Sequence, residues 1–289
     1  MNETRKAEFW NKEKNNAVRC GLCPHRCYIP ETAAGSCRVR ENVGGELFAS
    51  GYGLVSSIAL DPIEKKPLSM FRPGKNVLSI GGFGCNLRCP FCQNYEISME
   101  YGEIHEYTKK YTPDDIIKLA KQTISQNNIG VAYTYNEPLI GYEFVRDCAE
   151  LVFEEGLCNI LVTNGYINKE PFESLLPLID AMNIDFKGFT AGFYKKVYGD
   201  PRTVMNTIET AVKSCHVEVT TLVIPGENED DVADIAEWLA SVDPEIPLHL
   251  SRFFPRYRYS DKRPTPPETI LRLRDTAKKY LKNVITGNM

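Results

Sequence analysis

The sequence predicts an α/β protein whose main part is an open, partial (β/α)6 TIM-like barrel, preceded by a small cysteine-rich N-terminal segment. Six apolar runs alternate with amphipathic stretches of helical period, and the connections between them are short. This alternation is typical of a parallel sheet covered by helices. Six units are too few for a closed eight-stranded barrel, so we expect an open one. The predicted strands span residues 76–82, 130–135, 158–164, 181–186, 217–224 and 247–253.

The stretches between these strands carry helix signals of their own. The first opens with Thr112 as the capping residue and Pro113 at the first helical position, followed by two acidic residues. A capping hydroxyl, an early proline and acids in the first turn are the usual marks of a helix start. The predicted helices span residues 112–128, 143–156, about 168–178, 191–215, 228–241 and 266–281.

Length, charge and composition limit the class of protein. A chain of 289 residues is long enough for one large α/β domain, predicted over 71–289, and a small appendage, predicted over 1–70. The net charge of −4 gives no electrostatic support for binding nucleic acid or a membrane surface. No apolar run approaches membrane-spanning length, and residues 1–19 lack the apolar core of a secretion signal. We therefore expect a cytoplasmic protein without a nucleic-acid or membrane partner.

The ten cysteines are unevenly distributed along the chain. Three stand alone in apolar surroundings and are expected to be small buried side chains: Cys148, Cys158 and Cys215. The other seven form a first group of Cys20, Cys23, Cys27 and Cys37 and a second group of Cys85, Cys89 and Cys92. Because the cytosol keeps thiols reduced, such close spacing is better explained by metal or iron–sulfur ligation than by disulfides.

Polar residues gather where the predicted strands end. In parallel α/β barrels the working residues lie at this edge of the sheet. The first strand is followed by the second cysteine group, and the sixth carries His249 and Arg252. The strands between them lead into the segments NEP (136–138), TNG (163–165), DFK (185–187) and IPGEN (224–228). These segments are expected to lie together on one rim and to form a site.

The second cysteine group has a CxxxCxxC spacing and no fourth cysteine beside it. A cubane [4Fe–4S] cluster normally takes four thiolates, so three of them leave one iron free to bind another ligand. Glycines just before the loop would let the backbone bend closely around an inorganic core. Closed tetrahedral zinc would need a fourth ligand, while an open catalytic zinc site is an alternative that thiolate-rich ligation does not favour.

The segment CNLRCPFC (85–92) resembles the CxxxCxΦC motif of the radical S-adenosylmethionine (SAM) superfamily, with Phe91 as the aromatic residue. The resemblance extends through several motifs over residues 76 to about 257. It implies that the free iron of a [4Fe–4S] cluster binds the amino and carboxylate groups of SAM. It also implies reductive cleavage of SAM to methionine and a 5′-deoxyadenosyl radical, which abstracts hydrogen from a substrate.

The resemblance assigns SAM contacts to two of the rim segments. NEP occupies the place of the family's GGE stretch, which implies that Asn136 and Glu137 bind the SAM ammonium group. DFK resembles the DxK of the activating-enzyme branch and implies a role for Asp185 and Lys187. These two side chains are two residues apart on a strand and so point the same way, as a pair that faces a zwitterionic ligand would.

The resemblance also implicates the remaining rim segments. TNG matches the segment near the ribose and the methionyl carboxylate, which implies contacts from Thr163 and Asn164. IPGEN is similar to the adenine-side GxIxGxxE segment, which places Ile224 against the adenine. His249 matches a ligand-side histidine of the activating enzymes, although a lone histidine on a strand is more often a structural residue.

The N-terminal region narrows the resemblance. CGLCPHRC…GSCRVREN (20–42) and DPIEKKPLSMFRPG (61–74) are similar to the radical SAM protein of the AmmeMemoRadiSam system, a group related to pyruvate formate-lyase activating enzymes. This relationship implies a substrate residue in a partner protein or peptide and an electron donor such as flavodoxin or ferredoxin. The N-terminal cysteine segment and the loop 254–267 are expected to cover that substrate.

Three alternatives stay open beside the partner-protein interpretation. The substrate could be a free small molecule. The chain could be an iron–sulfur electron-transfer protein without catalysis, although the predicted SAM contacts argue against this. A zinc-ribbon nucleic-acid module would need a basic face, which the net charge of −4 does not favour.

The first cysteine group has a Cx2Cx3Cx9C spacing that indicates zinc or a second iron–sulfur cluster. Four thiolates would close a zinc tetrahedron and stabilise a segment too small to rely on its own core, so we favour zinc. His25 lies inside the motif and could replace one thiol. Farther along, the charged stretch IEKK (63–66) between two prolines is most easily explained as a solvated linker, while its match to the family motif suggests that it could contact a domain or partner.

Overall fold

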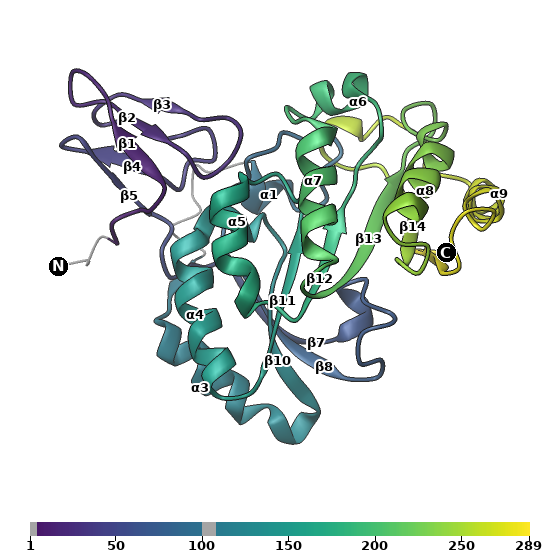
Figure 1. The fold of residues 1–289 in the computed structure, drawn as a ribbon, viewed down its shortest axis with the longest axis horizontal. Coiled ribbons are helices and arrows are strands. Elements are labelled where there is room, and N and C mark those ends of the chain that lie inside the picture. The colour runs from purple at the N-terminus through teal and green to yellow at the C-terminus, as the bar shows by residue number, and fades with distance from the viewer. Residues whose placement is uncertain (1–4, 100–107) are drawn as a thin grey trace.

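The computed structural model of the protein describes residues 5–99 and 108–289. Its centre is one sheet in the order β15-β14-β13-β12-β11-β10-β8-β7 (Figure 1). Six adjacent parallel strands match the predicted ones: β8 (Asn76–Gly81), β10 (Asn128–Tyr133), β11 (Cys158–Thr163), β12 (Ala181–Asp185), β13 (His216–Val223) and β14 (Leu248–Arg252). The predicted α/β fold with an open, partial barrel is confirmed.

Both edges of this sheet carry a strand that the sequence did not predict. β15 (Val284–Gly287) runs parallel to β14 at one edge. β7 (Ser57–Pro62) pairs antiparallel with β8 at the other, where Ser57 lies opposite Gly81. β7 belongs to the main sheet although it lies within the segment 1–70.

Helices cover the outer face of the sheet, and Figure 1 shows several of them in front of the strands. They are α3 (Pro113–Gln122), α4 (Tyr142–Glu154), α5 (Lys169–Leu175), α6 (Ala191–Lys196), α7 (Pro201–Ala211), α8 (Asp231–Val242) and α9 (Pro267–Ala277). α3 starts as predicted, with a capping box in which the Thr112 side chain accepts from the Asp115 amide. None of the helices in the described ranges is long and apolar enough to span a membrane.

The prediction of one helix over 191–215 is wrong, because the chain turns between α6 and α7. Tyr198 adopts a left-handed φ of 62°, which no helix interior tolerates. A new helix then starts with Pro201 at its first position, where the Asp200 side chain accepts from the amides of Arg202 and Thr203. The remaining short elements of the barrel are α1 (Tyr95–Ser98) and the 3-10 turns η1 (Ile63–Lys65), η2 (Ile124–Gln126), η3 (Pro138–Gly141), η4 (Leu176–Leu178) and η5 (Tyr257–Tyr259).

The prediction that residues 63–66 form a solvated linker holds for Glu64 and Lys65, which are exposed, and is wrong for Ile63 and Lys66. Lys66 is only 3% exposed, and Ile63 and Leu68 are completely buried. Both apolar side chains belong to a buried cluster with Val77, Ala132, Ile160 and Ala181, which lie on β8, β10, β11 and β12. The segment therefore closes the floor of the open barrel instead of crossing its surface.

Polar contacts fix the rest of this segment to the barrel. The Glu218 carboxylate on β13 accepts from the amides of Ser69 and Met70 at 3.0 and 2.8 Å. Asn183 on β12 donates to the Pro67 carbonyl at 2.8 Å. The chain from 61 to 74 is thus held by interactions that come from distant parts of the sequence.

The N-terminal segment forms small sheets of its own, which Figure 1 shows in purple beside the barrel. β1 (Trp10–Lys12), β2 (Val18–Cys20) and β3 (Tyr28–Ile29) form one sheet, and β4 (Glu41–Val43) pairs with β5 (Glu46–Phe48). β6 (Leu54–Val55) pairs with β9 (Lys109–Lys110). An ion pair of 3.1 Å between Arg40 and Glu143 on α4, both fully buried, joins the segment to the barrel.

Candidate functional site

The loop after β8 brings Cys85, Cys89 and Cys92 to the wall of one cavity of about 340 Å³. This volume lies within the range of small-molecule sites, roughly 300–1,000 Å³. The loop depends on Gly84, whose φ is +81° and where an added Cβ would lie 2.6 Å from the Cys37 carbonyl oxygen. Only glycine therefore lets the cysteine loop lie this close to the first cysteine group.

The residues around the second cysteine group fit a thiolate-bound cluster. The Cys85 sulfur accepts from the Leu87 amide at 3.3 Å and from the Asn164 side chain at 3.6 Å. Hydrogen bonds of this kind support cluster sulfurs in iron–sulfur proteins. Burial raises the pKa of Cys89 to about 12, against the charge of Lys187, which lowers it, and together with the charge of Cys92. The thiols therefore need a bound cation to ionise, which a cluster iron would supply.

Across the described ranges, no three His, Cys, Asp or Glu side chains are arranged so that they could hold a metal ion as they stand. The thiols of the first group are nevertheless close enough to influence one another. Burial raises the pKa of Cys23 to about 12, against a backbone hydrogen bond at His25 and together with the charges of Cys37, Cys20 and Cys27.

Asn136 holds the cysteine loop in place. Its side-chain oxygen accepts from the Gly82 amide at 2.9 Å, and its nitrogen donates to the carbonyls of Phe83 and Gly84 at 3.0 and 3.1 Å. This amide is engaged with the backbone on every side. The sequence predicted Asn136 as a SAM contact, and the structure gives it a positioning role for the loop as well.

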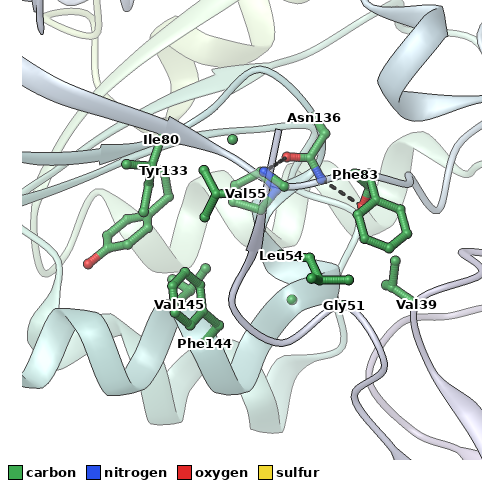
Figure 2. Close-up of a pocket in the computed structure, with 14 residues that line it drawn as sticks. Val39, Gly51, Leu54, Val55, Ile80, Phe83, Tyr133, Asn136, Phe144 and Val145 are labelled. Carbon is green, nitrogen blue, oxygen red and sulfur yellow. Dashed lines mark hydrogen bonds between the residues drawn. The ribbon is translucent and has the colours of Figure 1, made fainter. Parts of the chain in front are cut away.

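Figure 2 shows a second and separate pocket, beside Asn136 and between the N-terminal segment and the barrel. Its volume is about 50 Å³, far below what a ligand of the size of SAM requires. Apart from Asn136, the side chains labelled there are apolar or aromatic: Val39, Leu54, Val55, Ile80, Phe83, Tyr133, Phe144 and Val145. This pocket is a packing gap, whereas the larger cavity is lined by the second cysteine group and most of the predicted SAM contacts.

Glu137 lies fully inside the wall of the larger cavity. Its carboxylate accepts from the Thr163 hydroxyl at 2.6 Å and from the amides of Asn164 and Leu139 at 2.8 and 3.0 Å. Burial raises the pKa of Glu137 to about 7, against these hydrogen bonds and the charge of Lys187, which lower it. A nearby cation would therefore readily draw this group into its ionised form.

The TNG and DFK segments reach the same cavity. Thr163 ends β11 and Asn164 follows it, and the Asn164 side chain links the Cys85 sulfur to the Asn86 side chain. Lys187 pairs with Asp185 at 3.1 Å. Burial lowers the pKa of Lys187, but the charges of Asp185 and Cys89 outweigh it and raise that pKa above its ordinary value. The lysine is therefore a permanent cation beside the cysteines.

Of the three remaining predicted residues, one lines the cavity and two do not. Phe91 lines the cavity, and its ring packs 6.1 Å from Phe193 and 6.0 Å from Tyr259. Ile224 is completely buried, and the described residues that line the cavity include neither it nor His249. The structure therefore brings the other predicted SAM contacts together but places these two apart from them.

His249 is engaged in the barrel below the cavity. Its Nε2 lies 2.6 Å from the Glu218 carboxylate, which also faces His216 at 2.9 Å. Burial raises the pKa of Glu218, but these histidines and the amides of Met70 and Ser69 outweigh it and bring the pKa to about 2. His249 therefore helps to hold the segment that closes the barrel floor.

Two outlying pieces of chain pack against the cysteine loop. From the N-terminal segment, His25 lies 2.7 Å from the Asn86 carbonyl oxygen, and Arg88 donates to the Ser36 carbonyl. From the loop 254–267, the Arg258 amide donates to the Pro90 carbonyl at 3.0 Å. The two segments that were expected to cover the substrate, the N-terminal cysteine segment and the loop 254–267, thus both contact the cysteine loop.

Sequence analysis missed several residues that line the cavity: Lys65, Lys66, Tyr135, Thr220, Ser251 and Asn288. Tyr135 directly precedes the NEP segment and could have been included with it. The lysines could not be found in this way, because their segment precedes the first barrel strand and only the fold brings it to the cavity.

The comparison with family models decides the class of this site. The description "Radical SAM superfamily" matches residues 79–239, which is more than half of the chain. The chain belongs to the radical SAM superfamily. It is an enzyme of the radical SAM type, and this superfamily uses a [4Fe–4S] cluster and SAM, for which the cysteine loop and the rim segments provide fitting residues.

Curated relatives support the activating-enzyme-like branch of the superfamily. The uncharacterized protein MJ0808 of Methanocaldococcus jannaschii is 44% identical over 99% of this chain and 85% of its own length. The putative glycyl-radical enzyme activating enzyme MJ1227 of the same organism is 28% identical over 70% of this chain and 85% of its own. The pyruvate formate-lyase 1-activating enzyme of Escherichia coli is 27% identical over 51% of this chain and 61% of its own.

Solved structures of low sequence identity share the fold. QueE from Escherichia coli aligns with a TM-score of 0.53 at 13% identity, over 81% of this chain and 92% of its own. Streptococcus suis SuiB bound to S-adenosylmethionine aligns with a TM-score of 0.55 at 12% identity, over 71% of this chain and 48% of its own. At these identities the likenesses concern the fold alone.

Proposed function

We propose that this enzyme cleaves SAM reductively at a [4Fe–4S] cluster bound by Cys85, Cys89 and Cys92, and that it removes a hydrogen atom from a residue of a partner protein or peptide. The observation that carries the proposal is the shared cavity, which collects these thiols with Glu137, Asp185 and other rim side chains. When bound, the cluster would supply the electron that splits SAM into methionine and a 5′-deoxyadenosyl radical.

The rim side chains would bind and orient SAM. The Glu137 carboxylate would face the SAM ammonium group, and that positive charge would hold it ionised although its pKa is about 7. Lys187, a permanent cation paired with Asp185, would face the SAM carboxylate. Thr163 and Asn164 would extend the cradle towards the ribose, as they already fix Glu137 by two hydrogen bonds.

His249 would support the ligand side of the barrel through its partner Glu218. Ile224 is completely buried outside the cavity, so the proposed SAM cradle does not include it. An electron donor such as flavodoxin or ferredoxin would reduce the cluster. The net charge of the chain is −4, so we expect the electron donor to bind at a small charged patch and not at a broad basic surface.

For the first cysteine group we propose a structural metal, with zinc favoured over a second cluster. The group lies on short strands and turns, closed by the Cys20 amide donating to the Cys27 carbonyl at 3.0 Å. Four thiolates would saturate a zinc ion and leave no position for a substrate. Its place against Gly84 and Asn86 would then stabilise the loop that carries the reactive cluster.

Two observations favour a macromolecular substrate. Relatives of this chain are named as activating enzymes, one of them for pyruvate formate-lyase, which is itself a protein. The loop 254–267 and the N-terminal segment both contact the cysteine loop and could clasp an inserted peptide segment. A free small molecule is the second candidate, because the cavity wall also has polar side chains that the predicted SAM contacts do not use, among them Lys65, Thr220 and Ser251.

Deuterium transfer tests this substrate assignment. Cells that contain the protein would be grown in deuterated medium, and their extract divided into a macromolecular and a small-molecule fraction. Each fraction is then incubated anaerobically with the reduced enzyme and unlabelled SAM. We expect deuterium in 5′-deoxyadenosine only with the macromolecular fraction, and none with Cys89→Ala. Label that arrives only from the small-molecule fraction would overturn the partner-protein proposal and leave the radical chemistry in place.

A further inference from the structure

Two lysines line the cavity that holds the cysteine loop, and the predicted SAM contacts use neither of them. Lys65 and Lys66 come from the segment that closes the barrel floor. They share the cavity with Thr220 on β13 and Ser251 on β14, whose side chains are polar but uncharged. This part of the cavity wall therefore combines two positively charged side chains with two neutral hydroxyl groups.

Lys66 is held rigidly at this wall. Its side chain is buried, its Nζ lies 2.9 Å from the Asp61 carboxylate, and it stands 4.6 Å from the centre of the Tyr135 ring. The Tyr135 hydroxyl donates to the same carboxylate at 2.8 Å. Asp61, Lys66 and Tyr135 come from β7, the floor segment and the end of β10, so the fold assembles this cluster from three places.

The charges at this wall do not balance. Asp61 is shared between Lys66 and Lys65, whose Nζ lies 3.3 Å from its other oxygen, so one carboxylate faces two ammonium groups. The other lysine of the cavity, Lys187, has Asp185 as its own partner. The excess positive charge lies on Lys65, whose side chain is 67% exposed at the mouth of this wall, and Lys66 is the buried ammonium group that shares the one carboxylate with it.

A floor that served only stability would not need this arrangement. Burying an ammonium group is costly even when it is paired, and apolar residues of similar volume often stabilise a fold as well or better. Ile63 and Leu68 already supply apolar packing on either side of Lys66. A buried cation kept at the wall of a reaction cavity is therefore more readily explained by a ligand than by packing.

We infer that Lys66, with Lys65 beside it, binds a carboxylate group of the substrate inside the barrel. The described residues that line the cavity include two lysines here and no arginine, which suits a single carboxylate better than the doubly charged phosphate. Ser251 and Thr220 would offer neutral hydrogen bonds next to it. The inference rests on the proposed function and adds the substrate class: an acidic side chain or terminal carboxylate of a partner segment, or a small carboxylic acid.

Matched acid and amide probes test this inference by binding. The reconstituted protein is saturated with SAM, kept anaerobic and unreduced, and titrated calorimetrically. One pair of probes is acetyl-Gly-Asp-Gly-amide and acetyl-Gly-Asn-Gly-amide, and the other is succinate and succinamide. We expect the acid of at least one pair to bind about tenfold or more tightly than its amide, and the pair that discriminates identifies a peptide or a free acid as the source.

Variants of the protein locate the preference. In Lys66→Gln it should fall below about twofold, whereas Lys66→Arg should keep it. Lys121→Gln, which breaks a surface ion pair with Glu155, serves as the matched control and should bind like the unchanged protein. Equal binding of acid and amide by the unchanged protein, or a preference that survives in Lys66→Gln, would overturn the inference.

A second variant covers the case in which Lys66→Gln does not fold. Asp61→Asn removes the carboxylate that occupies Lys66, so the acid probe should raise the melting temperature of this variant more than that of the unchanged protein. An equal or smaller rise would refute the carboxylate site. SAM cleavage by the unchanged protein is measured separately, so that loss of the proposed function and loss of this site give different results.

Discussion

The two cysteine groups differ in what surrounds them. The second group opens onto a cavity of about 340 Å³, and barrel side chains such as Asn136 and Asn164 hold its loop by hydrogen bonds. The first group lies in a frame of short strands and turns, and none of its cysteines lines that cavity as the structure describes it. Three thiols beside space for a ligand suit catalysis, and four thiols without such space suit a structural metal.

The contrast also shows how the two groups depend on one another. The Cys37 carbonyl lies against Gly84, immediately before Cys85, and His25 reaches the Asn86 carbonyl. The first group therefore forms part of the wall behind the reactive loop. A structural metal there would fix the position of a loop that cannot be held by packing alone, since it must leave room for a cofactor.

Metal content should separate the two groups with the largest effect. Cys89→Ala should remove about four irons per chain and the brown colour, because two thiolates cannot retain the cluster. Cys23→Ala should instead remove about one zinc and leave the iron largely in place. Metal analysis and visible absorption after anaerobic reconstitution measure both, with Cys215→Ala, outside both groups, as control. Loss of a second set of irons in Cys23→Ala would replace the zinc proposal by an auxiliary cluster.

The buried ion pair between the N-terminal segment and α4 gives the next largest effect. Glu143→Gln should lower the free energy of unfolding by about 3–5 kcal/mol, because the buried Arg40 guanidinium loses its counter-charge. Denaturant titration measures this, and Lys121→Gln, which breaks an exposed pair with Glu155, should cost less than about 1 kcal/mol. Equal stability of the two variants would mean that the first group is not anchored through this pair.

Substitutions in the proposed SAM-binding residues should lower the affinity for SAM and leave the iron and zinc contents unchanged. Glu137→Gln should weaken SAM binding about ten- to a hundredfold, because a charge-assisted hydrogen bond in a shielded site contributes about 1.5–3 kcal/mol. Equilibrium binding of SAM to the unreduced protein measures this, with iron and zinc contents as controls. Asp185→Ala should act in the same direction. Unchanged affinity in both variants would remove these residues from the cradle.

The smallest effect concerns the contact between the two groups. His25→Gln should lower the free energy of unfolding by about 0.5–1.5 kcal/mol, the usual contribution of one hydrogen bond, here the one to the Asn86 carbonyl. The zinc content should stay the same, because the four cysteines suffice as ligands. A loss of zinc that matches that of Cys23→Ala would instead identify His25 as a metal ligand.

Much of the barrel was predictable from the sequence, because its strands are long apolar runs and its rim segments follow them directly. The edge strands were not. β15 has only four residues, and β7 is largely half-buried, so neither carries a strong apolar signal. The break after Tyr198 was missed for a different reason, because Gly199, Asp200 and Pro201 form a helix stop and start signal that was passed over in favour of the helical period.

The candidate site was predictable where function depends on residue type and spacing, as in the second cysteine group. It was not predictable where long-range contacts decide. The Lys66–Asp61 pair is local in sequence and looks like solvated charge until the fold buries it beneath Tyr135. Likewise, the Asn136 side chain turns to the cysteine loop because backbone groups some fifty residues away surround it.

The central claim is that the three-cysteine loop supports SAM cleavage. The most direct measurement is 5′-deoxyadenosine formed anaerobically from SAM and dithionite by the reconstituted protein, by Cys89→Ala and by Cys215→Ala. We predict product from the unchanged protein and from Cys215→Ala, and none above background from Cys89→Ala. Full cleavage by Cys89→Ala, or no cleavage by an unchanged protein that holds its iron, would contradict the account.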